Sequence, residues 1–284
     1  MNKETKKIEL LNPKSDYVFK RIFGHVGNEE ITCNLLNSIL EHKITKIELD
    51  KNPILERDLL DDKLGILDIK AEADDHMNIN IEMQVIDQKN IEKRLLYYWS
   101  KMYIKGIQKA QDYEKLEKSI IVLFSDYNLK NLEGIKKYMT QWNIREKENH
   151  TVVLTNIFEI YIIELEKYKE QTNNKELDTW VKFLRNPEVI NMEKASKEVR
   201  KAKEVLEEIS QDERERYLAE LRQKYVMDQK AMIDAGYDKG IEKGREEGKH
   251  EKAIEIAKNL KAMRISLEEI EKVTGLLKEE IERL

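Results

Sequence analysis

The chain has 284 residues, of which 40% are hydrophobic and 38% are charged, and it contains only 3 prolines. This composition is typical of a soluble, helix-rich globular protein and excludes a fibrous or intrinsically disordered chain. The formal net charge of −5 gives no overall attraction to nucleic acid, so a DNA site would have to rely on local basic residues and a bridging metal ion.

Membrane insertion and export are not expected. No apolar run approaches the roughly 20 residues needed to span a bilayer, and residues 1–7 lack the apolar stretch of a signal peptide. Cys33 is the only cysteine, so neither an intrachain disulfide nor a thiolate metal site can form within one chain. These features favour a cytoplasmic protein.

The first part of the chain is expected to be helical. After a turn-like segment, apolar residues recur at helical spacing over 18–23, with Ser15 or Asp16 as the N-cap. Gly24 is expected to end this helix. A second apolar helical face covers residues 31–40.

Residues 64–85 contain two short isoleucine-rich runs separated by turn-forming residues, which predicts a β-hairpin centred on Asp75. Antiparallel pairing about this centre puts Asp68 directly opposite Glu82. Directly opposed residues have Cβ atoms about 4.5–5.5 Å apart on one face. Two carboxylates are therefore predicted to converge.

Lys70 and Gln84 fall on the same face as these acids, because side chains alternate along a strand. Opposed like charges destabilise a sheet unless a cation lies between them. The pair therefore suggests Mg²⁺, with Mn²⁺ as a substitute, held by oxygen ligands. Such an ion lowers the pKa of bound water and stabilises charge on a phosphoryl oxygen. The alternative, which hairpin geometry alone favours, is that both carboxylates lie on a solvated face.

The remaining pattern predicts an α/β fold. A long helix is predicted over 95–117, followed by a buried strand over 119–124 and further strands over 151–154 and 158–163. After about residue 170 the pattern is helical to the end.

Four segments resemble the Rpn family of recombination-promoting nucleases and transposases, which belongs to the PD-(D/E)xK nuclease superfamily. Residues 67–71, 80–84 and 94–103 are similar to the family's core, and residues 15–24 are similar to its first helix. The resemblance covers most of the chain. It implies a restriction-endonuclease-like mixed sheet flanked by helices, followed by an all-helical C-terminal appendage.

The resemblance also implies roles for individual residues. Asp68 matches the first acid of the superfamily motif and Glu82 the second, and both are expected to bind metal. Gln84 stands where the superfamily usually has lysine; it can orient water but supplies no positive charge. Lys70 is expected to replace that lysine in part, or to be an ordinary strand lysine. Asp16 resembles an acid of the family's first helix and is expected to support the metal through water, or to act only as an N-cap.

Basic and aromatic residues follow the hairpin. Arg94 and Lys101 are expected to bind DNA phosphate, and Tyr97 and Tyr98 to pack against bases or sugars. The alternative is that the basic residues lie on the solvated face of an amphipathic helix, while Tyr98, Trp99 and Met102 fill the core.

The expected function is that of a metal-dependent DNA endonuclease, a Mg²⁺-dependent deoxyribonuclease acting in recombination or transposon-related DNA processing. DNA is the expected partner. The alternative is a catalytically weak or inactive DNA-binding or assembly protein that retains the nuclease fold, which Gln84 and the negative net charge favour. A third interpretation is a helical scaffold whose core only displays the tail.

The tail has a glycine at every fourth position: Gly236, Gly240, Gly244 and Gly248. Each interior glycine costs a helix about 1 kcal/mol relative to alanine, so the segment is expected either to pack in a homo-oligomer or to be a flexible linker. Repeat slippage would also produce the pattern. The apolar face that follows comprises Ala253, Ile256, Ala257 and Leu260.

Two short helices are predicted at the end of the chain. Ser266 and Glu269 form a capping box, and Gly275 turns the chain into the last helix. The predicted domains are a nuclease core over 1–170, a helical extension over 171–235, and the glycine-spaced tail with its short helical pair over 236–284.

Overall fold

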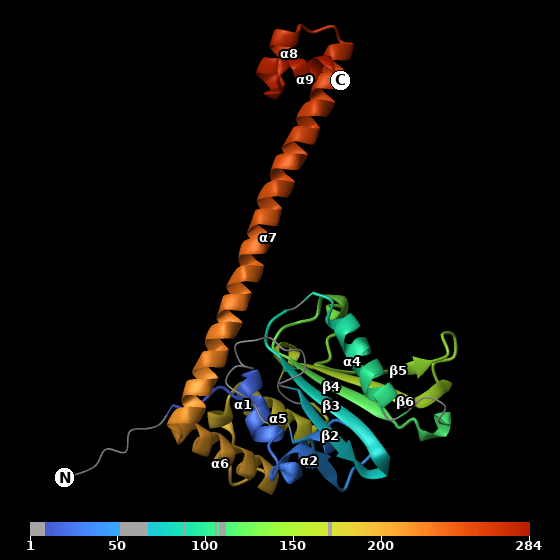
Figure 1. Cartoon of the computed structure of the whole chain (residues 1–284), viewed down its shortest axis with the longest axis vertical. Coiled ribbons are helices and arrows are strands. Elements are labelled where there is room, and N and C mark those ends of the chain that lie inside the picture. The colour runs from blue at the N-terminus through green and yellow to red at the C-terminus, as the bar shows by residue number, and fades with distance from the viewer. Residues whose placement is uncertain (1–8, 52–67, 88, 106, 108–111, 170–171) are drawn as a thin grey trace, which may run out of the picture. The chain divides into compact units, whose positions relative to one another are not determined.

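The chain has two compact units, and the first of them ends at Val226. A mixed β-sheet forms the centre of this first unit (Figure 1). The computed structural model describes residues 9–51, 68–87, 89–105, 107, 112–169 and 172–284. Residues 1–7 and residues 64–67 of the predicted hairpin lie outside these ranges. Within them, the sheet has the order β1-β2-β3-β4-β6-β5. Its strands are β1 (Ile47–Leu49), β2 (Ile69–Ala73), β3 (Met77–Gln84), β4 (Ser119–Ser125), β5 (Met139–Arg145) and β6 (Val153–Glu164).

Strand directions divide the sheet into three parts. β1, β2 and β3 pair antiparallel, β3, β4 and β6 pair parallel, and β5 returns antiparallel to β6. The parallel pair β3 and β4 needs a crossover connection, and α4 (Ile91–Lys105) lies in it. The predicted mixed α/β sheet flanked by helices is therefore confirmed.

Three sequence expectations were wrong in detail. Residues 151–154 and 158–163 do not form two strands, because β6 runs unbroken from Val153 to Glu164 and joins the end of the first range to all of the second. β1 and β5 were not predicted. The predicted helix over 95–117 ends at Lys105, and the described residues 112–118 contain only a short 3-10 turn.

Helices cover both faces of the sheet (Figure 1). The first face packs on an aromatic cluster in which the ring centroids of Phe19 and Phe124 lie 5.5 Å apart and those of Phe23 and Trp180 lie 5.4 Å apart. The second face packs on α4 through Ile91 and its neighbours. The other elements of this unit are α1 (Asp16–Phe23), α2 (Glu29–Asn37), α5 (Lys175–Arg185), α6 (Lys197–Gln211), the first part of α7 (Glu213–Ala262), and the 3-10 turns η1 (Asp74–His76), η2 (Tyr113–Lys115), η3 (Lys130–Leu132), η4 (Leu165–Lys167) and η5 (Pro187–Val189).

Gly24, which ends α1 as predicted, brings this helix against the start of β2. A Cβ atom at Gly24 would lie 2.9 Å from Cγ1 of Ile69 and 3.0 Å from the backbone oxygen of Lys20. Real Cβ contacts are longer than this, and overpacking of a core typically costs about 1–3 kcal/mol. We expect Gly24→Ala to lower the free energy of unfolding by about that amount in urea denaturation. Gly134→Ala is the matched control, since its Cβ would meet no described atom within 4 Å, and equal midpoints for both variants would contradict the prediction.

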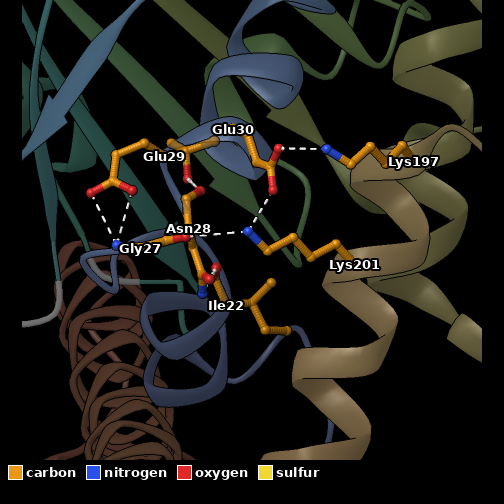
Figure 2. Close-up of polar contacts among 8 residues, drawn as sticks. Ile22, Gly27, Asn28, Glu29, Glu30, Lys197 and Lys201 are labelled. Carbon is orange, nitrogen blue, oxygen red and sulfur yellow. Dashed lines mark hydrogen bonds and ion pairs between the residues drawn. The ribbon is translucent and has the colours of Figure 1, made fainter.

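The turn between α1 and α2 is tied to α6 (Figure 2). The Glu29 carboxylate accepts hydrogen bonds from the backbone N–H of Gly27 at 2.9 and 3.0 Å. Glu30 pairs with Lys197 at 3.1 Å and also with Lys201. Hydrogen bonds from these two lysines lower the pKa of Glu30. Because Glu30 is a surface residue, these pairs fix the geometry of the turn more than they stabilise the fold.

Helices α5 and α6 belong to the same core as the sheet. Their apolar residues, including Leu177, Phe183 and Leu206, are fully buried in one cluster with the inner face of the strands. The chain divides into two compact units between Val226 and Met227. The three predicted domains with limits at residues 170 and 235 stay a prediction.

The second unit contains the rest of α7, α8 (Leu267–Thr274) and α9 (Lys278–Glu282). The capping box of Ser266 and Glu269 is present, and Gly275 ends α8 with a φ of 72°. A small core joins the three helices through Ala257, Ile270, Leu276 and Ile281. The predicted place of Ile256 in the apolar face was wrong, since it is 37% exposed while Ile254 packs inward.

The four regularly spaced glycines lie inside α7 and are exposed. The segment is therefore helical, and the linker interpretation was wrong. In the described ranges, no helix combines the length and apolar character needed to cross a membrane.

Candidate active site

The β2–β3 hairpin has the predicted register. Ile69 pairs with Ile81 and Lys70 with Asn80, and the next position of this register sets Asp68 opposite Glu82. Both acids are buried, with exposed fractions of 8% and 4%. The solvated-face interpretation of these two carboxylates was therefore wrong.

The apolar residues of the hairpin face the aromatic core, as alternation predicted, and the polar residues face the side of α4. Gln84 is 9% exposed, and its Nε2 donates to the backbone oxygen of Ile86 at 3.3 Å. Asn80 pairs with Lys70, lies two residues before Glu82 on the same strand face, and is 5% exposed. Its Oδ1 is buried and finds no hydrogen-bond partner in the described part of the chain. Alternation along β3 pointed to Asn80, which the sequence reasoning overlooked.

Burial dominates the electrostatics of Asp68. It raises the pKa of this carboxyl above its usual range, and a hydrogen bond with the Asn80 side chain opposes that rise. The positive charges of Lys70, Arg94 and Lys20 oppose it further. Lys20 is a buried residue of α1 that the sequence did not single out. Lys70 is exposed.

The raised pKa of Asp68 predicts a pH-dependent stability in metal-free protein. The folded protein keeps the proton to a higher pH than the unfolded chain, so stability falls as the pH rises through the folded pKa. We expect Asp68→Asn and the wild type to be similar in strong acid, and Asp68→Asn to be the more stable at neutral pH. Urea denaturation in the presence of a chelator measures this. A stability difference that is the same at every pH would contradict it.

Glu82 is paired with Arg94 of α4. Nη2 of Arg94 lies 3.0 Å from Oε1 of Glu82, and the two side chains are 23% and 5% exposed. The guanidinium also lies 5.8 Å from the ring centroid of Tyr98. Burial lowers the pKa of Arg94. The Glu82 carboxylate, Tyr98 and Asp68 together raise it by more, so the net shift is upward. The predicted phosphate-binding residue thus contacts a predicted metal ligand.

A groove of about 720 Å³ opens between the hairpin and α4. Asp68 and Asn80 lie in its wall, and Lys70, Lys101 and Lys105 supply positive charge. Nζ of Lys101 lies 4.6 Å from the ring centroid of Tyr97, which is half exposed. Tyr98 and Trp99 pack partly into the core beneath α4, as the alternative interpretation held, and Tyr98 also lines the groove.

Asp16 is not among the residues that line this groove. Its Oδ2 accepts hydrogen bonds from Nε and Nη2 of Arg222 at 2.9 and 2.7 Å, and its Oδ1 accepts one from the backbone of Tyr17. Ser15 occupies the N-cap position of α1. The structure therefore puts Asp16 in a buried ion pair with Arg222.

The donor set of the hairpin fits a hard divalent cation. Asp68 and Glu82 supply carboxylate oxygens, and Asn80 adds a buried amide oxygen that lacks a partner among the described residues. In the ranges that the structure describes, no three or more His, Cys, Asp or Glu side chains are grouped so that they could hold a metal ion together. Mg²⁺ is commonly held by one or two carboxylates and keeps several waters, so a two-carboxylate site suits it.

Comparison with protein families identifies the group to which this site belongs. The family described as PD-(D/E)XK nuclease family transposase matches residues 13–236. The chain belongs to this family. The match spans every strand of the sheet and the first part of α7, so the matched part of the chain has a nuclease fold. Searches of curated proteins and of solved structures found no match.

Membership in the family gives the site its coarse chemistry. PD-(D/E)XK nucleases generally use divalent metal ions, and their substrate is DNA. In this chain the hairpin brings Asp68 and Glu82 together, while Gln84 stands on the same face without a charge. Arg94, Lys70 and Lys20 are the cations near the two acids.

Proposed function

We propose that this chain is a Mg²⁺-dependent DNA endonuclease in which Asp68 and Glu82 hold the metal ion, with Mn²⁺ able to substitute. The main support is the burial of two carboxylates that are neighbours in register. Burying two like charges is costly unless a cation compensates them. Family membership adds a DNA substrate, and a role in recombination or transposon-related DNA processing follows as part of the proposal.

Four further components have separate parts in this reaction. A bound divalent ion would lower the pKa of a water molecule bound to it and would stabilise charge on the phosphoryl oxygen. Gln84, held through its contact with Ile86, orients the attacking water. Lys70 supplies positive charge in place of the usual motif lysine. Lys101, beside Tyr97 in the groove, binds the DNA backbone.

The test is nicking of supercoiled plasmid DNA by the purified full chain. We expect nicked and linear products with Mg²⁺ or Mn²⁺ and none in excess chelator. Restoring Mg²⁺ after chelation should restore cleavage. Cleavage that persists in chelator would exclude the proposed mechanism.

A second candidate is a DNA-binding or assembly protein with weak or no catalysis. The observation in its favour is the neutral Gln84 at the lysine position of the motif. The same samples separate the two candidates: retarded DNA with no nicking at any Mg²⁺ or Mn²⁺ concentration would favour this one.

We also propose that the second unit forms homo-oligomers and that the protein is cytoplasmic. Exposed apolar residues of α7, Ile233, Tyr237 and Ile241, follow one another at four-residue spacing beside the glycines. Small residues let two helix backbones approach closely. Light scattering on the full chain and on Tyr237→Glu would test this, and an unchanged mass would contradict it.

A further inference from the structure

The contact between Arg94 and Glu82 joins a candidate DNA-binding cation to a candidate metal ligand. Glu82 is almost fully buried, so its charge needs a positive partner inside the fold. Arg94 supplies it at 3.0 Å. A divalent ion on the same carboxylate would compete with the guanidinium, because two cations on one carboxylate repel each other.

The position of Arg94 on α4 suggests where it goes when the pair opens. Arg94, Lys101 and Lys105 are seven and four residues apart, a spacing that sets them along one face of a helix. Lys101 and Lys105 line the groove. The Arg94 side chain is 23% exposed and thus reaches the solvent side of the buried pair. Arginine binds phosphate with a planar, two-pronged geometry.

We propose that Arg94 is the built-in counter-ion of the metal site: it holds Glu82 until a divalent cation takes that carboxylate, and it then takes a DNA phosphate. This role of Arg94 rests on the proposed function. It adds to that function that metal binding and DNA binding depend on each other through one side chain. Because such coupling is reciprocal, the metal ion tightens DNA binding by the factor by which DNA tightens metal binding.

The experiment measures binding and not cleavage. Ca²⁺ shares the oxygen preference of Mg²⁺, and its affinity for the full-length chain is measured by calorimetry with and without a short fluorescent DNA duplex. DNA affinity is measured by fluorescence anisotropy with and without Ca²⁺ at one ionic strength, with gels recording whether the duplex stays intact. The variants are Arg94→Gln, Arg94→Lys and Lys101→Gln.

In the wild type we expect Ca²⁺ to tighten DNA binding by about 5-fold or more, within the usual range of coupling between two sites. Without DNA, Arg94→Gln should bind Ca²⁺ at least about 5-fold more tightly, because the competing cation is gone. Its DNA affinity should respond to Ca²⁺ clearly less than that of the wild type, because only the direct contact between the metal ion and the DNA phosphate remains to couple the two ligands. Arg94→Lys should shift Ca²⁺ affinity in the same direction by less, and it decides the outcome if Arg94→Gln does not fold.

Lys101→Gln is the matched control, since it removes one positive charge from the same helix and groove. It should weaken DNA binding, leave Ca²⁺ affinity nearly unchanged and keep the coupling. If Ca²⁺ binding tightens equally in both Gln variants, the loss of any nearby positive charge explains the effect, and the proposal is overturned. Unchanged coupling between Ca²⁺ and DNA in folded Arg94→Gln would also overturn it. A wild type that neither binds Ca²⁺ nor cleaves with Mg²⁺ would instead overturn the proposed function itself.

Discussion

Replacing either acid of the hairpin is expected to lower Mg²⁺-dependent plasmid nicking by about 10²-fold or more, because each removes one charged ligand of the metal ion. The variants are Asp68→Asn and Glu82→Gln, which keep the shape of the side chain. Steady-state nicking of supercoiled plasmid at saturating Mg²⁺ measures the effect.

Glu72→Gln is the matched control for this prediction. Glu72 lies on the same face of β2 and lines the same groove, but it is exposed and pairs with His76 at 3.1 Å. Its substitution should change nicking by no more than a few-fold, as expected for a surface pair. Circular dichroism establishes that each variant is folded. Full activity in folded Asp68→Asn would remove this acid from the site.

Loss of the buried pair between Asp16 and Arg222 is expected to be among the most destabilising changes in the chain. Both side chains are 10% exposed, and breaking such a pair leaves an uncompensated buried charge at a cost of about 3–5 kcal/mol. Asp16→Ala should therefore lower the free energy of unfolding by about that amount at neutral pH, as measured by urea denaturation.

The same variant separates a structural Asp16 from a supporting acid of the metal site. Under conditions where Asp16→Ala is folded, nicking should stay within a few-fold of the wild type. Lys46→Ala, which opens a solvent-exposed pair with Glu48, should leave stability unchanged within error. Unaltered stability of Asp16→Ala with strongly reduced nicking would assign Asp16 to the metal site instead.

The register of the hairpin could be predicted because it depends on local chemistry. The turn around Asp75 fixes which residues oppose each other, and strict alternation from Ile69 to Gln84 fixes the faces. β6 could not be predicted as one strand for a related reason. The first residues of β6 pair only with β5, and side chains there, such as that of Leu154, are exposed. Polar residues at such positions carry no burial cost. They therefore interrupt the apolar pattern by which a strand is predicted.

The polar partners of the site could not be predicted from local pattern. The pair of Glu82 and Arg94 depends on how α4 packs over the sheet. Lys20 approaches Asp68 only because α1 closes on the start of β2 through Gly24. Asp16 and Arg222 are 206 residues apart in sequence, and no spacing rule connects them.

The ion pairs of α1 with the first turns of α7 determine how short a folded version of this protein could be. Arg222 holds Asp16, Glu215 holds Arg21 at 2.8 Å, and Leu218 is buried in the sheet's own core. A gene truncated after the last strand would leave Asp16 and Arg21 without these contacts and uncover apolar surface. The smallest stable form of this nuclease fold therefore has to include the beginning of α7, and insertions or fusions that leave the fold intact belong after Val226.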